Sequence, residues 1–207
     1  GWLRMHDYIP PKLEDAFPAL FAHPFASFLA YLVLVDFAMY WVHRAQHAFG
    51  FWWALHALHH SQREMTFWTD DRNHLLDMVM TDAVLALVAL LVGVAPGQFV
   101  AIVAVTRAVE SLSHANVRMS FGRVGEWLLV SPRFHRVHHA IGLGHEGRSR
   151  GHNFAVLFPV WDHLFGTANM TQEFPATGIR DQLHGRDYGE GFWRQQWLGL
   201  KRLAGRA

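Results

Sequence analysis

The topology of this chain depends on residues 75–113, which read LLDMVMTDAVLALVALLVGVAPGQFVAIVAVTRAVESLS. The part from Ala83 to Thr106 contains 24 residues without a charge or a histidine, which is long enough for one membrane crossing. However, Ala95-Pro96-Gly97 lies in the middle and is typical of a turn. The alternatives are therefore a single span, or a helical hairpin with arms at about 75–94 and 97–113, each near the minimum length for a crossing.

A second apolar run lies nearer the N-terminus. Phe25–Val42 is 18 residues long, is interrupted only by Asp36, and is just long enough to cross a bilayer. Strict alternation of apolar and polar residues is not sustained anywhere, so we expect a mainly α-helical protein. The chain begins at Gly1 rather than at methionine, as a fragment or a processed chain would.

Composition excludes several classes of protein. Apolar residues make up 51% of the chain, which excludes intrinsic disorder. The chain has no cysteine, which excludes a disulfide scaffold, an iron–sulfur cluster and a zinc-thiolate site. The net charge is only +1, so we expect no nucleic-acid partner. With 207 residues, one domain over 1–207 is the simplest organisation.

The 16 histidines are concentrated in three patterns. Residues 43–47 read HRAQH, 56–60 read HALHH and 135–139 read HRVHH. On a helix, residues three and four positions apart share a face, and imidazole is a common ligand of iron, copper and zinc. At this histidine content, about 0.09 copies of HxxHH are expected by chance, and two are present. The candidate metal ligands are His43, His47, His56, His59, His60, His135, His138 and His139.

A shared metal site constrains the topology. The first two histidine patterns precede the long apolar stretch and the third follows it, so a single crossing would place them on opposite sides of a membrane. A hairpin through Pro96 returns the chain to the same side. We therefore predict three crossings, one of them Phe25–Val42, in an integral-membrane helical bundle with a histidine-rich cap. Basic residues near the helix ends on the histidine side place this cap in the cytoplasm by the positive-inside rule.

The order of these patterns resembles that of a known family. HxxxH is followed by two HxxHH patterns, then by Asn153-Phe154 and by WDHLFGT at residues 161–167, with PRFHRVHH at residues 132–139. This arrangement resembles the membrane-bound fatty acid hydroxylase and sterol desaturase superfamily. The resemblance covers about 30–168 and leaves a tail at 169–207. It implies two iron ions, with zinc as a substitute in purified material, that use O2 to oxidise a lipid C–H bond.

The resemblance also implies further site residues. His114 matches an additional ligand histidine between the second and third patterns, although relatives often carry a pair there and this chain has Ser113. His74 is similar to a histidine that follows the second pattern in many bacterial members, with helix capping as its alternative role. The residues that we expect to orient ligands are Asp36, Glu110, His152 and Asp162. For Asp36, an interhelical hydrogen bond is the alternative.

Function follows from the resemblance. We expect hydroxylation or desaturation of a fatty acid, sterol or similar lipid. The chain has no glycine-rich dinucleotide fingerprint and no cysteine for a cluster, so a separate reductase or ferredoxin would supply electrons. The alternatives are a non-catalytic membrane carrier of metal or haem, and a dizinc hydrolase whose activity does not depend on O2.

Two other segments have alternative interpretations. Residues 141–147 form either a lid or an ordinary solvent loop. Trp193, Trp197 and Leu200 share one helical face beside basic residues. That face suits either a helix on the membrane surface or docking onto the protein body.

Overall fold

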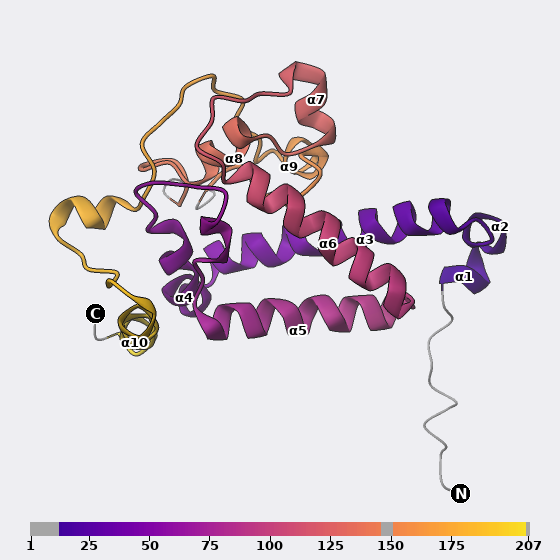
Figure 1. The fold of residues 1–207 in the computed structure, drawn as a ribbon, viewed down its shortest axis with the longest axis horizontal. Coiled ribbons are helices and arrows are strands. Elements are labelled where there is room, and N and C mark those ends of the chain that lie inside the picture. Colours follow the sequence, from indigo (N-terminus) through magenta and orange to yellow (C-terminus); the bar gives the residue numbers. More distant parts are fainter. Residues whose placement is uncertain (1–12, 146–150, 206–207) are drawn as a thin grey trace, which may run out of the picture.

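The computed structural model describes residues 13–145 and 151–205, and the regular secondary structure of this part is helical (Figure 1). Outside the helices, the described residues contain one isolated bridge between Ala140 and Thr177 and no extended sheet. The prediction of a mainly α protein is confirmed. The elements are α1 (Leu13–Ala16), α2 (Pro18–Phe21), α3 (Pro24–Ala48), α4 (Gly50–His60), η2 (Thr69–Asp71), α5 (Leu75–Val92), α6 (Pro96–Ser113), α7 (Gly122–Leu128), α8 (Pro132–His138), α9 (Val160–Leu164), η3 (Arg180–His184) and α10 (Phe192–Leu203).

Helices α5 and α6 form the predicted hairpin, so the single-span alternative is excluded. Gly93 ends α5 with a φ of 87°, a left-handed conformation that favours glycine. Pro96 begins α6, where its missing N–H is not needed. The hairpin turn is tied to α3, because the Tyr31 hydroxyl donates a hydrogen bond to the Gly93 carbonyl at 3.3 Å.

Two helices, α3 and α5, are long and apolar enough to cross a membrane. Helix α5 exposes much of its apolar surface, including Val79, Leu90 and Leu91, which is unfavourable in water and favourable in lipid. Helix α6 carries Arg107 and Glu110 and is not among these two. Membrane association is therefore supported, while the third crossing remains a prediction.

The WDHLFGT segment packs against the middle of α3 through Asp36. The Asp36 carboxylate accepts hydrogen bonds from the Leu157 and Phe158 N–H groups at 2.9 and 3.1 Å and from the Trp161 indole at 2.8 Å. Asp36 is buried, and its hydrogen-bond partners among the described residues include no histidine. It therefore makes the interhelical contact that was the alternative reading, and it does not orient a ligand directly.

Candidate metal centre

Nine histidines from α3, α4, α8 and the end of α6 converge in the interior. The side-chain nitrogens of each of three groups lie within 4.8 Å of one another, and all of these histidines are buried. One group contains both His60 and His139, and each of the other two groups contains one of them. The rings of His60 and His139 stack with centroids 4.3 Å apart, so the three groups form one continuous centre. The groups are His43, His47, His56 and His60; His59, His114, His135 and His139; and His60, His138 and His139.

The Nε2 atoms approach one another in pairs without a carboxylate between them. Nε2 of His60 lies 3.1 Å from Nε2 of both His47 and His138. Nε2 of His114 lies 3.1 Å from Nε2 of His59 and 3.2 Å from Nε2 of His135. Nitrogens bound about 2.1 Å from one metal ion at right angles are about 3.0 Å apart. The spacing therefore fits neighbouring ligands of a common ion.

The other ring nitrogen of several histidines is held by an acceptor, which leaves Nε2 as the lone-pair atom. His43 Nδ1 donates to the Phe154 carbonyl at 2.8 Å and His138 Nδ1 donates to the His152 carbonyl at 2.7 Å. His56 Nε2 is buried without a hydrogen-bond partner among the described residues. A buried nitrogen in this state costs free energy unless something binds it.

Asp77 was not predicted as a site residue. It is buried, and its carboxylate accepts hydrogen bonds from Nδ1 of His56 at 2.9 Å and from the Gln46 amide and Trp52 indole at 2.7 and 2.8 Å. It therefore orients His56 in the manner expected of a carboxylate behind a metal ligand. Its position in the first turn of α5 is the only sequence signal, and that is equally typical of a helix start.

Glu110, His152 and Asp162 act on the histidines through the backbone. The Glu110 carbonyl accepts from Nδ1 of His114 at 2.8 Å, whereas the Glu110 carboxylate lies 3.5 Å from Arg107. His152 likewise contributes its carbonyl. The Asp162 carboxylate accepts from the Phe154 and Ala155 N–H groups, both at 2.8 Å, and so holds the segment whose carbonyl binds His43.

His74, which the resemblance suggested as a ligand, lies outside the three groups. Its Nε2 donates to the Gln196 carbonyl at 2.9 Å, and its Nδ1 accepts from the Leu76 N–H at 3.2 Å. Both ring nitrogens are therefore occupied, as the capping alternative requires. The contact with α10 is close, because a Cβ placed on Gly199 would lie 2.2 Å from Cδ2 of His74.

Burial favours the uncharged form of six histidines of the centre. Burial, together with the facing imidazoles, lowers the pKa of His59, His60, His135, His138 and His139 well below 6.5. The pKa of His114 falls to about 4, again mainly through burial. These imidazoles are therefore neutral at physiological pH, which is the form that binds metal.

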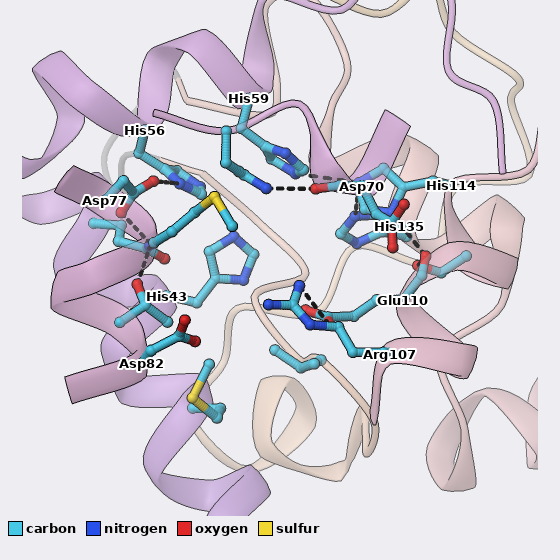
Figure 2. A pocket seen from close by; sticks show the side chains of 17 residues that line it. His43, His56, His59, Asp70, Asp77, Asp82, Arg107, Glu110, His114 and His135 are labelled. Carbon is cyan, nitrogen blue, oxygen red and sulfur yellow. Dashed lines mark hydrogen bonds and ion pairs between the residues drawn. The ribbon is translucent and has the colours of Figure 1, made fainter. Parts of the chain in front are cut away.

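A cavity of about 90 Å³ adjoins the histidines (Figure 2). His43, His56, His59, His114 and His135 line one end, while Asp82, Arg107 and Glu110 line the other. Asp70, which also lines the cavity, lies in the short helix η2 and accepts a hydrogen bond from Ser111 at 2.6 Å. The centre is thus open on one side to a small polar chamber.

The family model for fatty acid hydroxylase matches residues 28–167. The chain belongs to the fatty acid hydroxylase family. The match covers all nine converging histidines and the WDHLFGT segment, so the resemblance seen in the sequence is confirmed.

Curated relatives of the family match the same region. The ornithine lipid hydroxylase OlsE of Rhizobium tropici is 33% identical over 66% of this chain and 40% of its own length. Alkylglycerol monooxygenase of Homo sapiens is 29% identical over 70% of this chain and 31% of its own length. This chain therefore spans less than half the length of these relatives. No solved structure matches it.

Proposed function

We propose that this chain is a membrane oxygenase that uses two iron ions and O2 to hydroxylate a lipid. The observation that carries the proposal is the convergence of nine buried histidines into one continuous centre, in a chain of the fatty acid hydroxylase family. The relatives described above, a lipid hydroxylase and a monooxygenase, favour hydroxylation over desaturation.

The donor set fits two metal ions. His43, His47, His56, His60 and His138 would hold one ion, and His59, His114, His135 and His139 would hold the other. Neutral imidazole suits iron and also zinc, so zinc is expected to occupy the same ligands in some preparations. The chemistry expected of such a pair of iron ions, when bound, is O2 activation for oxidation of a C–H bond.

The chain's own residues would orient the ligands and exclude water. The Phe154, His152 and Glu110 carbonyls and the Asp77 carboxylate hold ring nitrogens in place. Fixed rings keep the ligand geometry constant during turnover. The buried ring of Phe154 lies against the rings of His43, His47 and His138 and restricts water at the reacting centre.

We also propose that the centre lies on the cytoplasmic side of three crossings and takes electrons from a separate reductase or ferredoxin. The hairpin supports the topology, because histidines that precede α5 and histidines that follow α6 converge in one centre. The sequence contains no cysteine and no dinucleotide fingerprint, which supports a separate electron donor.

The rival functions make different predictions. A haem carrier would use isolated histidines on separate spans, whereas these histidines are clustered. A dizinc hydrolase would share the ligands but would act without O2.

Elemental analysis of the detergent-purified protein tests the proposal first. We expect about two iron or zinc atoms per chain, with His59→Ala and His138→Ala each losing one of them because they fall in different halves of the centre. An iron-loaded sample supplied with electrons and a lipid extract should then form oxygenated lipid only in the presence of O2. Zero or one metal ion in the parent protein, or product formed without O2, would contradict the proposal.

A further inference from the structure

Three arginines gather around the loop that joins α9 to η3. The guanidinium carbons of Arg118 and Arg136 lie 4.6 and 3.7 Å from the centre of the Phe174 ring, which places two like charges at one ring. Four residues further along the loop, a Cβ placed on Gly178 would lie 2.8 Å from Cδ of Arg63. We call this surface the arginine face, and it consists of Arg63, Arg118 and Arg136.

The arginine face has no acidic partner in the described part of the chain, where no ion pair joins any of its members to a carboxylate. Exposed arginines elsewhere do pair. Side-chain nitrogens of Arg186 and Arg194 lie 3.1 and 2.6 Å from the carboxylates of Asp181 and Asp187. Like charges without a counter-charge repel one another and attract an anionic group. The arginine face therefore suits an acidic partner.

The loop beneath the arginine face is bonded directly to the helix that carries candidate metal ligands. The Gly178 N–H donates to the His139 carbonyl at 3.1 Å. Nε of Arg136 donates to the Pro175 carbonyl at 2.8 Å, and Arg136 follows His135 in α8. A partner bound to the arginine face would therefore lie next to α8, which is where electrons from outside the chain are needed.

The loop itself faces water more favourably than lipid. The exposed positions from 172 to 180 are Gln172, Glu173, Ala176 and Arg180. Anionic headgroups would repel the Glu173 carboxylate, whereas α5 and α10 expose apolar side chains such as Leu90 and Trp193. Arginine is also enriched where proteins bind one another. A soluble acidic protein therefore fits this surface better than a membrane does.

We propose that the arginine face is the docking surface of the electron donor, a soluble one-electron carrier protein with acidic side chains around its redox group. The inference rests on the proposed oxygenase function and names the partner class and its site. Each docked carrier would give up one electron, so two carriers are oxidised as two ferric ions become ferrous, and no bond or proton is exchanged. Opposite charges would speed this association and orient the carrier.

Fluorescence quenching at one position of the loop tests the docking without turnover. The chain has no cysteine, so Ala176→Cys, at an exposed position, takes a single fluorescent label. The labelled protein would be placed in lipid nanodiscs as purified, with an acidic ferredoxin as the probe. We expect iodide to quench the free label, and ferredoxin to protect it in a saturable manner that added salt weakens. Absence of protection overturns the proposal.

Matched double variants connect the protection to the arginine face. Arg63→Gln with Arg118→Gln removes two charges, and neither side chain donates a hydrogen bond in the described part of the chain, so the fold should persist. We expect the ferredoxin concentration that gives half-protection to rise about tenfold. Arg194→Gln with Lys201→Gln removes the same charge from α10 and should change it by less than about twofold. Equal effects of the two double variants overturn the proposal.

Contact with lipid is the competing outcome. Quenching of the label by nitroxide-bearing phospholipid rather than by iodide would make the arginine face a membrane contact and would overturn the docking of a soluble carrier.

The two proposals fail separately. Protection needs neither iron nor O2, so its absence rejects the docking surface and leaves the oxygenase function standing. Protection without oxygenated product in an iron-loaded sample rejects the oxygenase function and leaves the docking surface standing.

Discussion

At the scale of single residues, the centre depends on groups that fix one ring nitrogen so that the other is available. Asp77 does this for His56 and also joins α3 and α4 to α5, because Gln46 and Trp52 donate to the same carboxylate. Backbone carbonyls do it for His43, His114 and His138. Only the carboxylate can be tested by substitution without moving the chain.

Asp77→Asn should weaken metal binding. The amide keeps one oxygen for the Gln46 and Trp52 donors and turns an N–H group toward Nδ1 of His56, so His56 loses its acceptor. The expected loss of metal affinity is about 10- to 100-fold. Chelator competition followed by metal analysis measures it. Asp71→Asn, at an exposed position of η2, is the matched control. Equal affinities of the two variants would contradict the assigned role of Asp77.

Metal release should require a lower pH than ordinary histidine ligands would give. Burial lowers the pKa of His114 from 6.5 to about 4 and lowers those of the other five histidines considered above. Protonation of the folded centre is therefore disfavoured until the pH falls well below 6.5. The unfolded chain already binds protons at its histidines below 6.5, so the free energy of unfolding decreases as the pH falls from 6.5 to the folded-state pKa. Equilibrium dialysis at stepped pH should retain metal at pH 6 and lose it near 4. Complete loss already at pH 6 would contradict this.

At the scale of elements, the contact between α3 and the segment 157–161 depends on Asp36. Asp36→Ala removes three hydrogen bonds to a buried carboxylate and leaves two backbone N–H groups without partners. We expect the free energy of unfolding to fall by about 3 kcal/mol, seen as a lower melting temperature in detergent. Asp36→Asn keeps one acceptor oxygen, so its melting temperature should lie between those of the parent protein and Asp36→Ala. An unchanged melting temperature of Asp36→Ala would exclude this anchoring role.

Helix α10 both docks on the protein and presents an apolar face. Gln196 and Gly199 are buried against the start of α5, while Trp193 and Trp197 are 80% and 58% exposed. Figure 1 shows α10 end-on while α5 lies across the view, so the two axes are roughly perpendicular. A helix perpendicular to a spanning helix, with tryptophans on its free face, suits the membrane surface.

Spin labels can locate this face. The chain has no cysteine, so Trp193→Cys and Arg194→Cys each give one labelling position on neighbouring residues of α10. In vesicles we expect the label at 193 to be relaxed mainly by O2 dissolved in lipid, and the label at 194 mainly by a water-soluble relaxation agent. Equal access of the soluble agent to both positions would place the whole helix in water.

At the scale of the whole molecule, the predicted three crossings place the hairpin turn and the histidine side on opposite faces of the membrane. Gly97→Cys and Arg123→Cys test this, since a Cβ on Gly97 meets no atom within 4 Å and Arg123 is exposed. In right-side-out bacterial vesicles we expect an impermeant maleimide to label position 97, and to label position 123 only after permeabilisation. Labelling of both positions without permeabilisation would reject the topology.

Much of this protein could be predicted from local patterns. Apolar length, Pro96 and Gly93 are enough for the hairpin, because turn chemistry and helix propensity act between near neighbours. Histidine spacing is enough to place His56, His59 and His60 on one side of a helix, and the requirement for a shared site then relates them to His135, His138 and His139. His114 was predicted as a ligand from the family resemblance, and it lies beside His59, His135 and His139.

The remaining assignments needed contacts between distant parts of the chain. His74 and Asp77 are three positions apart, yet one caps α5 beneath α10 and the other orients His56. Their separate roles depend on partners elsewhere in the chain. Asp77 binds His56, which is 21 positions away, and His74 binds the Gln196 carbonyl, which is 122 positions away. By itself, the sequence determined the helices, the turn and the histidine faces, because these depend on short-range geometry. Only the tertiary structure decided which nitrogens converge and which acceptors hold them, because the burial and the hydrogen bonds of the centre arise between distant segments once α3, α4, α6 and α8 pack together.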